Sequence, residues 1–136
     1  TSQGSHSAIR LVGDPQRTEM TFSGNRMENF RSWSTELTLL QFSNFKNLAF
    51  VDNEFIGSPE DLKLAGEKIF LSLVAFFFHP EEETDVSKLV MRNNSFQDLT
   101  VKNSILKFEH ATSAEVIIGL KYKNCFAPLG LIAVVQ

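Results

Sequence analysis

Residues 68–78, K-I-F-L-S-L-V-A-F-F-F, constrain the fold of this chain more than any other segment. Almost every position is apolar, so a strand formed by this run would be buried on both faces. Its four phenylalanines favour a strand, and Gly66 just before it would cost roughly 1 kcal/mol inside a continuing helix. We therefore predict that this run is a central strand covered by a layer on each side.

The residues directly before this run carry a helix start. Ser58 can cap the first turn, Pro59 suits the first helical position, and two acidic residues follow at the positive end of the helix dipole. The sequence predicts a helix that begins at Pro59 and ends near Gly66. If the helix instead continued, residues 59–78 would form one long helix packed on an antiparallel sheet, and the fold would be α+β.

Short segments of alternating apolar and polar residues fill most of the remaining chain, which is typical of strands. These segments are residues 8–12, 17–22, 35–42, 48–51, 99–108, 115–123 and 129–135. The first two are predicted to form a hairpin or neighbouring strands, and a short helix or turn is expected over residues 26–33. The alternation changes phase near Asn103, which indicates a bulge.

Within residues 115–123 the alternation predicts that Val116, Ile118, Leu120 and Tyr122 face the core. The chain shows no obvious repeat with a period of 20–50 residues. The predicted fold is therefore mainly β, an antiparallel sandwich or open barrel with one or two short helices.

The length of 136 residues fits one domain and is too short for two. Residues 1–7 resemble a cloning remnant, which leaves residues 8–136 as a single globular domain. The sequence stops at an apolar run, residues 131–135, where a polar and frayed terminus is more usual. We expect a domain cut from a longer protein; the alternative is a small protein whose last strand is central.

Composition argues against several classes of protein. The net charge of −3 does not favour a nucleic-acid binder. The longest nearly unbroken apolar run, residues 69–78, is ten residues and too short for a membrane-spanning helix, so no membrane insertion is expected. A single cysteine cannot form an internal disulfide, which predicts an intracellular location in the cytoplasm or nucleus.

Few residues suit catalysis or metal binding. Cys125 could pair with His110, and Asp98 or Glu109 could orient that imidazole, but a lone thiol near a strand end is more often a packing residue. His79 precedes three glutamates, which is too few strong ligands for structural zinc. No nucleophile elbow or phosphate-binding glycine loop is found. The sequence therefore predicts no enzyme, no metal and no cofactor.

The excess of phenylalanine, thirteen against one Trp and one Tyr, favours a core together with an apolar contact surface. We predict a non-catalytic interaction or assembly module that binds a protein partner, or a second copy as a dimer, through a sheet edge or an apolar groove. The predicted partner-binding residues are Val101, Phe108, Leu131, Ile132 and Val134. An alternative is a small β domain that binds an apolar ligand; an enzyme using Cys and His, or a nucleic-acid binder, are weaker alternatives.

Overall fold

The computed structural model describes residues 6–14, 17–28, 30, 32, 36–57, 69–78, 88–109 and 115–135. These residues form thirteen strands joined by turns, with no helix among them. Every pair of neighbouring strands in the described part of the chain runs parallel. The fold is therefore mainly β, as the sequence predicts, but its strand pairing differs from the prediction.

The strands form three sheets, named A, B and C. Sheet A contains β1 (His6–Val12), β4 (Leu37–Ser43), β7 (Phe70–Phe77), β10 (Val101–Glu109) and β13 (Ile132–Val135). Sheet B contains β2 (Glu19–Ser23), β5 (Asn47–Val51), β8 (Lys88–Arg92) and β11 (Glu115–Ile118). Sheet C contains β3 (Arg26–Glu28), β6 (Glu54–Ile56), β9 (Ser95–Gln97) and β12 (Lys121–Lys123).

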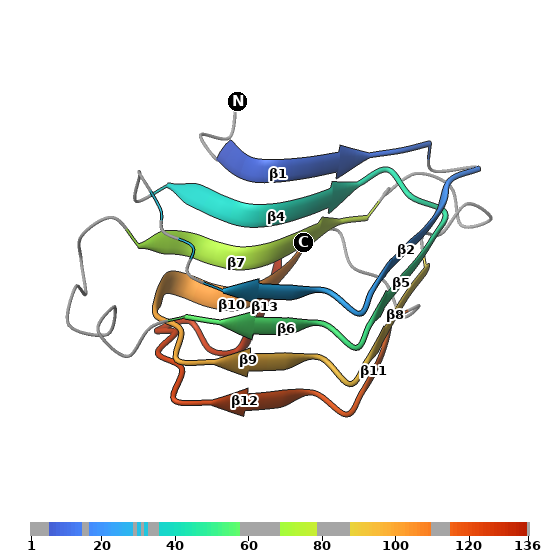
Figure 1. The fold of residues 1–136 in the computed structure, drawn as a ribbon. Helices are drawn as coiled ribbons and strands as arrows, with labels where there is room; N and C mark the ends of the chain where they lie inside the picture. The colour runs from blue at the N-terminus through green and yellow to red at the C-terminus, as the bar shows by residue number, and fades with distance from the viewer. Residues whose placement is uncertain are drawn as a thin grey trace.

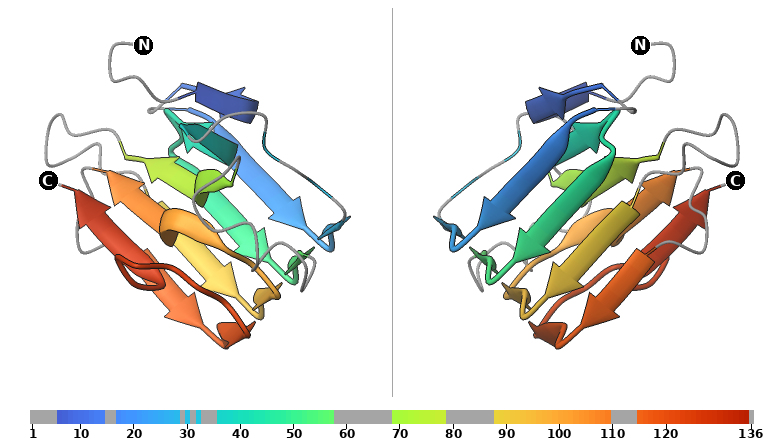
Figure 2. Two further views of the ribbon diagram at one scale, coloured as in Figure 1. Left: turned by 90° about the vertical axis from the view of Figure 1, so that its left-hand side faces the viewer. Right: turned by 90° about the vertical axis from the view of Figure 1, so that its right-hand side faces the viewer.

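Successive strands along the chain belong to successive sheets, so the chain winds from A to B to C and back to A. Each winding is one coil, and each coil lies on the one before it, which makes the fold a parallel β-helix. Sheets A and C form the two broad faces in Figure 1, and sheet B closes one side between them. Figure 2 shows the strands of sheet B side by side with the same direction.

The turn between sheets B and C repeats in all four coils. Its six-residue sequence reads FSGNRM, FVDNEF, MRNNSF and IIGLKY at residues 22–27, 50–55, 91–96 and 117–122. The third residue of each repeat has a positive φ, between 53° and 68°. Gly, Asn and Asp tolerate that conformation best, which explains why Gly24, Asp52, Asn93 and Gly119 occupy this position.

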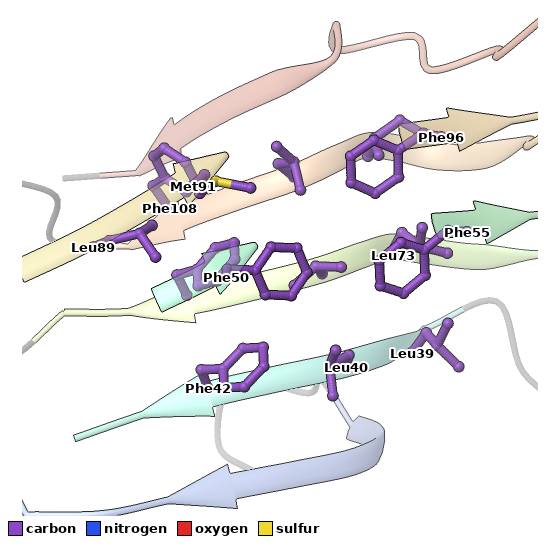
Figure 3. Packing of buried hydrophobic residues seen from close by; sticks show 14 of the residues in the cluster. Leu39, Leu40, Phe42, Phe50, Phe55, Leu73, Leu89, Met91, Phe96 and Phe108 are labelled. Carbon is purple, nitrogen blue, oxygen red and sulfur yellow. The ribbon is translucent and has the colours of Figure 1, made fainter. Parts of the chain in front are cut away.

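Phenylalanine rings stack from coil to coil inside the β-helix (Figure 3). Rings at equivalent positions lie nearly parallel in three pairs, with centroids between 5.2 and 5.5 Å apart. The pairs are Phe22 with Phe50, Phe42 with Phe76, and Phe55 with Phe96. Phe50 and Phe76 pack edge to face and join the ladders of sheets A and B. The high phenylalanine content therefore builds a continuous core.

A ladder of three asparagines runs beside the aromatic core, at the turn between sheets B and C. The Asn53 backbone N–H and Nδ2 both donate to Asn94 Oδ1 at 3.1 Å, and Nδ2 also donates to the Phe22 carbonyl at 2.8 Å. Asn25 donates in the same way to Asn53 Oδ1. Asn53 and Asn94 are almost completely buried, so the ladder satisfies polar groups that water cannot reach.

The predicted antiparallel sandwich or open barrel is wrong, because the described strands pair only in parallel. Residues 8–12 and 17–22 form no hairpin: β1 pairs with β4, and β2 pairs with β5. The long helix over residues 59–78 is also wrong, because β7 is a strand. The predicted helix start at Pro59 lies outside the described residues.

Among the other local predictions, two are confirmed and one is wrong. The strand expected over residues 68–78 is confirmed as β7, and the bulge near Asn103 is confirmed by a register shift between Val101 and Ser104. Residues 115–123 are not one strand, because the turn at Gly119 divides them into β11 and β12. That turn changes the phase of the alternation, so Ile118 is exposed and Ile117 packs against the core.

Replacing Asn53 with Ala should lower the free energy of unfolding by about 3 kcal/mol, because it leaves several buried hydrogen-bonding groups without partners. Asn47→Ala provides the matched control: Asn47 is half-buried in β5, outside the ladder. Its effect should stay below about 0.5 kcal/mol. Urea unfolding of the three proteins measures the difference, and equal losses in both variants would contradict a stabilising ladder.

Candidate functional site

The five predicted partner-binding residues lie in different environments. Val101 and Phe108 are 1% and 3% exposed in β10, which has β7 on one side and β13 on the other. Leu131 and Ile132 are half-buried against the core. Val134 is 53% exposed in β13, which pairs only with β10 among the described strands. Among the described strands β13 is therefore one edge of sheet A, β1 is the other, and Val101 and Phe108 are core residues.

The large exposed hydrophobic side chains mark the two ends of the β-helix. Among the described residues they are Ile9, Leu11, Val12, Ile118, Tyr122, Phe126, Leu129 and Val134. The first three belong to β1, and the other five follow the start of β11. The coils between them expose no such side chain in their described residues. Isolated apolar residues are normal on a surface, but the confinement of these side chains to two ends sets the end surfaces apart from the side walls.

The head face is the end formed by β1, β2 and β3. It contains a hollow of about 280 Å³ between β1 and β2. Leu11, Val12, Met20, Thr21, Phe22 and Phe42 line it. Leu11 is in register with Phe42 and continues that core ladder, yet it is 38% exposed because the described structure has no further coil above it.

The tail face is the end formed by β11, β12, β13 and the segment 124–131. Tyr122 is in register with Phe96 and so continues an inward-facing ladder, but it is 63% exposed. Leu120 stands where the earlier coils have asparagine, so the asparagine ladder ends here in an apolar residue. The tail face therefore presents apolar side chains in positions that face the core in every earlier coil.

Reasoning from the sequence missed most of the end residues, including Leu11 and Tyr122. The signal that could have found them is the repeated six-residue turn, which defines the coils and therefore the first and last of them. Without the coils, an apolar residue such as Tyr122 is indistinguishable from a core residue.

Cys125 lies in the tail segment with its thiol half-buried. Burial raises the pKa of this thiol above its ordinary value, and the negative charge of Asp98 adds to the rise; hydrogen bonds with the backbone of Leu99 and Lys123 oppose it. A reactive cysteine needs a lowered pKa, so this environment is that of a packing residue. His110 and His79 lie outside the described residues.

Two other features of the described residues bear on function. No three His, Cys, Asp or Glu residues are grouped so that they could hold a metal ion. The Lys107 Nζ atom lies 3.4 Å from Glu109 Oε2 and over the ring of Phe77, so the charge of Lys107 is paired within sheet A.

Comparisons of the chain with protein-family models, with curated proteins and with solved structures find no match. In the part of the chain that the structure describes, no helix is long and apolar enough to cross a membrane. The function is therefore inferred from the two end faces alone.

Alkylation of Cys125 by iodoacetamide should reach half its maximal rate at a higher pH in the folded protein than in the urea-unfolded chain. The folded state holds the thiol proton more tightly, so the free energy of unfolding should also fall as pH rises through the pKa of the unfolded thiol. A folded profile at or below that of the unfolded chain would show an activated thiol instead.

Proposed function

We propose that this protein is an interaction module that binds protein through the end faces of its β-helix. The observation that carries the proposal is the confinement of the large exposed hydrophobic side chains, among the described residues, to β1 and to the chain from β11 onward. The side walls carry the polar and charged residues of each coil, so the ends differ in chemistry from the rest of the surface.

The backbone supports the same surfaces. An outermost strand of a sheet offers unpaired N–H and C=O groups to another strand. In the described structure each end has three such strands, β1, β2 and β3 at the head and β11, β12 and β13 at the tail. A partner that adds a strand gains hydrogen bonds from the backbone and selectivity from the apolar side chains beside it.

The core ladders add a third support. Each internal coil is covered on both sides, and Phe50 and Phe76 are fully buried there. At the ends, the ladder residues Leu11 and Val134 are 38% and 53% exposed. Covering such a residue stabilises a complex by roughly 25 cal/mol for each Å² of apolar surface removed from water.

A lysine placed on an end face should weaken association. Leu11→Lys changes the head, and Val134→Lys changes the tail. At least one of them should raise the dissociation constant of the self-associated protein by roughly tenfold, because an ammonium group must be desolvated at an apolar contact. Sedimentation velocity over a range of protein concentrations measures this change.

Val90→Lys is the matched control, because Val90 is half-buried in β8 on the side wall of an internal coil. It should leave association unchanged. Wild-type protein that stays monomeric at every concentration would exclude self-association through the end faces, and an equal loss of association in the control would contradict the proposal. Thermal unfolding checks that each variant remains folded.

The hollow at the head supports a second candidate function, binding of a small apolar ligand. Its volume of about 280 Å³ lies just below the range of roughly 300–1,000 Å³ that is usual for ligand pockets. A hollow of this size can equally accept a side chain of a partner, so we rank ligand binding second.

Titration with the fluorescent apolar probe anilinonaphthalene sulfonate tests the second candidate. Saturable binding that Leu11→Lys abolishes and Val134→Lys preserves would support a ligand site at the head. No saturable binding, or equal binding to both variants, would contradict it.

A further inference from the structure

One motif of the chain plays no part in the end faces. The residues Asn93-Asn94-Ser95 match the acceptor triplet for N-glycosylation, in which Ser or Thr follows Asn after one residue other than Pro. None of the other eight asparagines of the chain stands in such a triplet. A triplet of this kind often arises by chance, so its meaning depends on where the fold places its residues.

The fold gives the three residues of the triplet different environments. They lie at the turn between β8 and β9, the third of the four turns between sheets B and C. Asn94 is 1% exposed and is held in the asparagine ladder, where its Nδ2 donates to the Phe50 carbonyl at 2.8 Å. Asn93 is exposed, and Ser95 is half-buried. The asparagine that would carry a sugar is therefore on the surface, while its neighbour is fixed in the core.

The side chains of Asn93 and Ser95 are free as well as accessible. The Asn93 backbone N–H donates to the Ile118 carbonyl at 2.9 Å, which ties the turn to the next coil. The Asn93 carboxamide and the Ser95 hydroxyl make no hydrogen bond with the described residues. The carboxamides of Asn53 and Asn94, by contrast, are both used in the ladder. The two groups that define the acceptor triplet are thus the two that the fold leaves unused.

The next coil leaves room beside Asn93. Gly119 occupies the equivalent position of that coil, and a Cβ atom there would lie 2.5 Å from Asn93 Oδ1. A larger residue at this position would therefore displace the Asn93 carboxamide. The turns between sheets B and C form an outer edge of the molecule (Figure 2). Glycine at position 119 keeps the carboxamide unobstructed at that edge.

We propose that Asn93 is an N-glycosylation site whose substrate is an oligosaccharide carried on a lipid pyrophosphate. In the transfer, Asn93 Nδ2 forms a bond to C1 of the first sugar, and the bond from C1 to the pyrophosphate oxygen breaks. The lipid pyrophosphate is the leaving group, and Nδ2 gives up one proton to a base of the transferase. The step is a substitution and involves no oxidation or reduction. The inference goes beyond the proposed function and does not rest on it.

The proposal places the chain in the secretory pathway, whereas the single cysteine predicts the cytoplasm or nucleus. The environment of that cysteine also suits an oxidising compartment. Burial raises the pKa of the Cys125 thiol, which lowers the fraction of thiolate, the form that reacts with oxidants and disulfides. A half-buried thiol of this kind is compatible with secretion, so the cysteine count does not oppose a glycan at Asn93.

A glycan at Asn93 is also compatible with contact through the ends of the β-helix. Asn93 belongs to neither the head face nor the tail face. Next to its turn, the outer side of sheet B carries the half-buried apolar side chains of Ala49, Val51 and Val90. A glycan is bulky and hydrated, so it would shield this part of the side wall from other proteins. It would leave the end faces open.

Mass spectrometry of the native protein tests the proposal. The protein is isolated from the cells that make it and treated with peptide-N-glycosidase in heavy-oxygen water, which converts each glycosylated asparagine into a labelled aspartate. We expect the label at Asn93 and at no other asparagine. Unlabelled Asn93, or a label confined to another asparagine, would overturn the proposal.

Variants made in the same cells test the role of the triplet. Glycosidase treatment should increase the gel mobility of the wild-type chain by one step. Asn93→Gln and Ser95→Ala should both lose this shift, because each removes one half of the acceptor triplet. Asn103→Gln is the matched control: Asn103 is half-buried in β10 and is followed by Ser104, but no Ser or Thr stands at the third position. It should keep the shift.

A shift that survives Asn93→Gln, or one that is lost equally in Asn103→Gln, would contradict glycosylation at Asn93. Urea unfolding midpoints, measured after glycosidase treatment, show whether each variant is folded. The state of the end faces does not enter this test, so its failure would leave the proposed function in place.

Discussion

The parallel register between successive coils is the constraint on which the rest of this structure depends. Because each coil repeats the path of the one before it, each side chain lies on its equivalent in the next coil. Phe42 meets Phe76 and Asn53 meets Asn94 for that reason. An aromatic pair contributes about 0.5–1.5 kcal/mol beyond its buried area, and the amide ladder satisfies donors and acceptors in a place without water. Like residues therefore stabilise the stack, and a shift by one residue would break both ladders at once.

The same constraint makes the ends of the stack unlike its walls. Leu11 and Tyr122 are exposed even though they occupy inward positions, since the described structure has no further coil beyond them. The two ends also differ from each other: the head retains Asn25, while Leu120 stands at the corresponding place near the tail. A polar ladder residue at one end and an apolar one at the other give the two faces different chemistry.

The sequence predicts single strands well and their pairing badly, for a physical reason. The run at residues 68–78, which is apolar on both faces, contains β7, and the phase change near Asn103 corresponds to a bulge. Both could be predicted because both are local consequences of burial. Alternation has the same period in parallel and antiparallel strands, so it cannot reveal which strands pair. The repeated turn between sheets B and C would have revealed the pairing, but its spacing along the chain is irregular. Asn25, Asn53 and Asn94 are 28 and 41 residues apart, because segments of unequal length interrupt the coils. For the same reason the expected edge included Val101, which lies in an internal strand, as well as Val134, which lies at the end of sheet A.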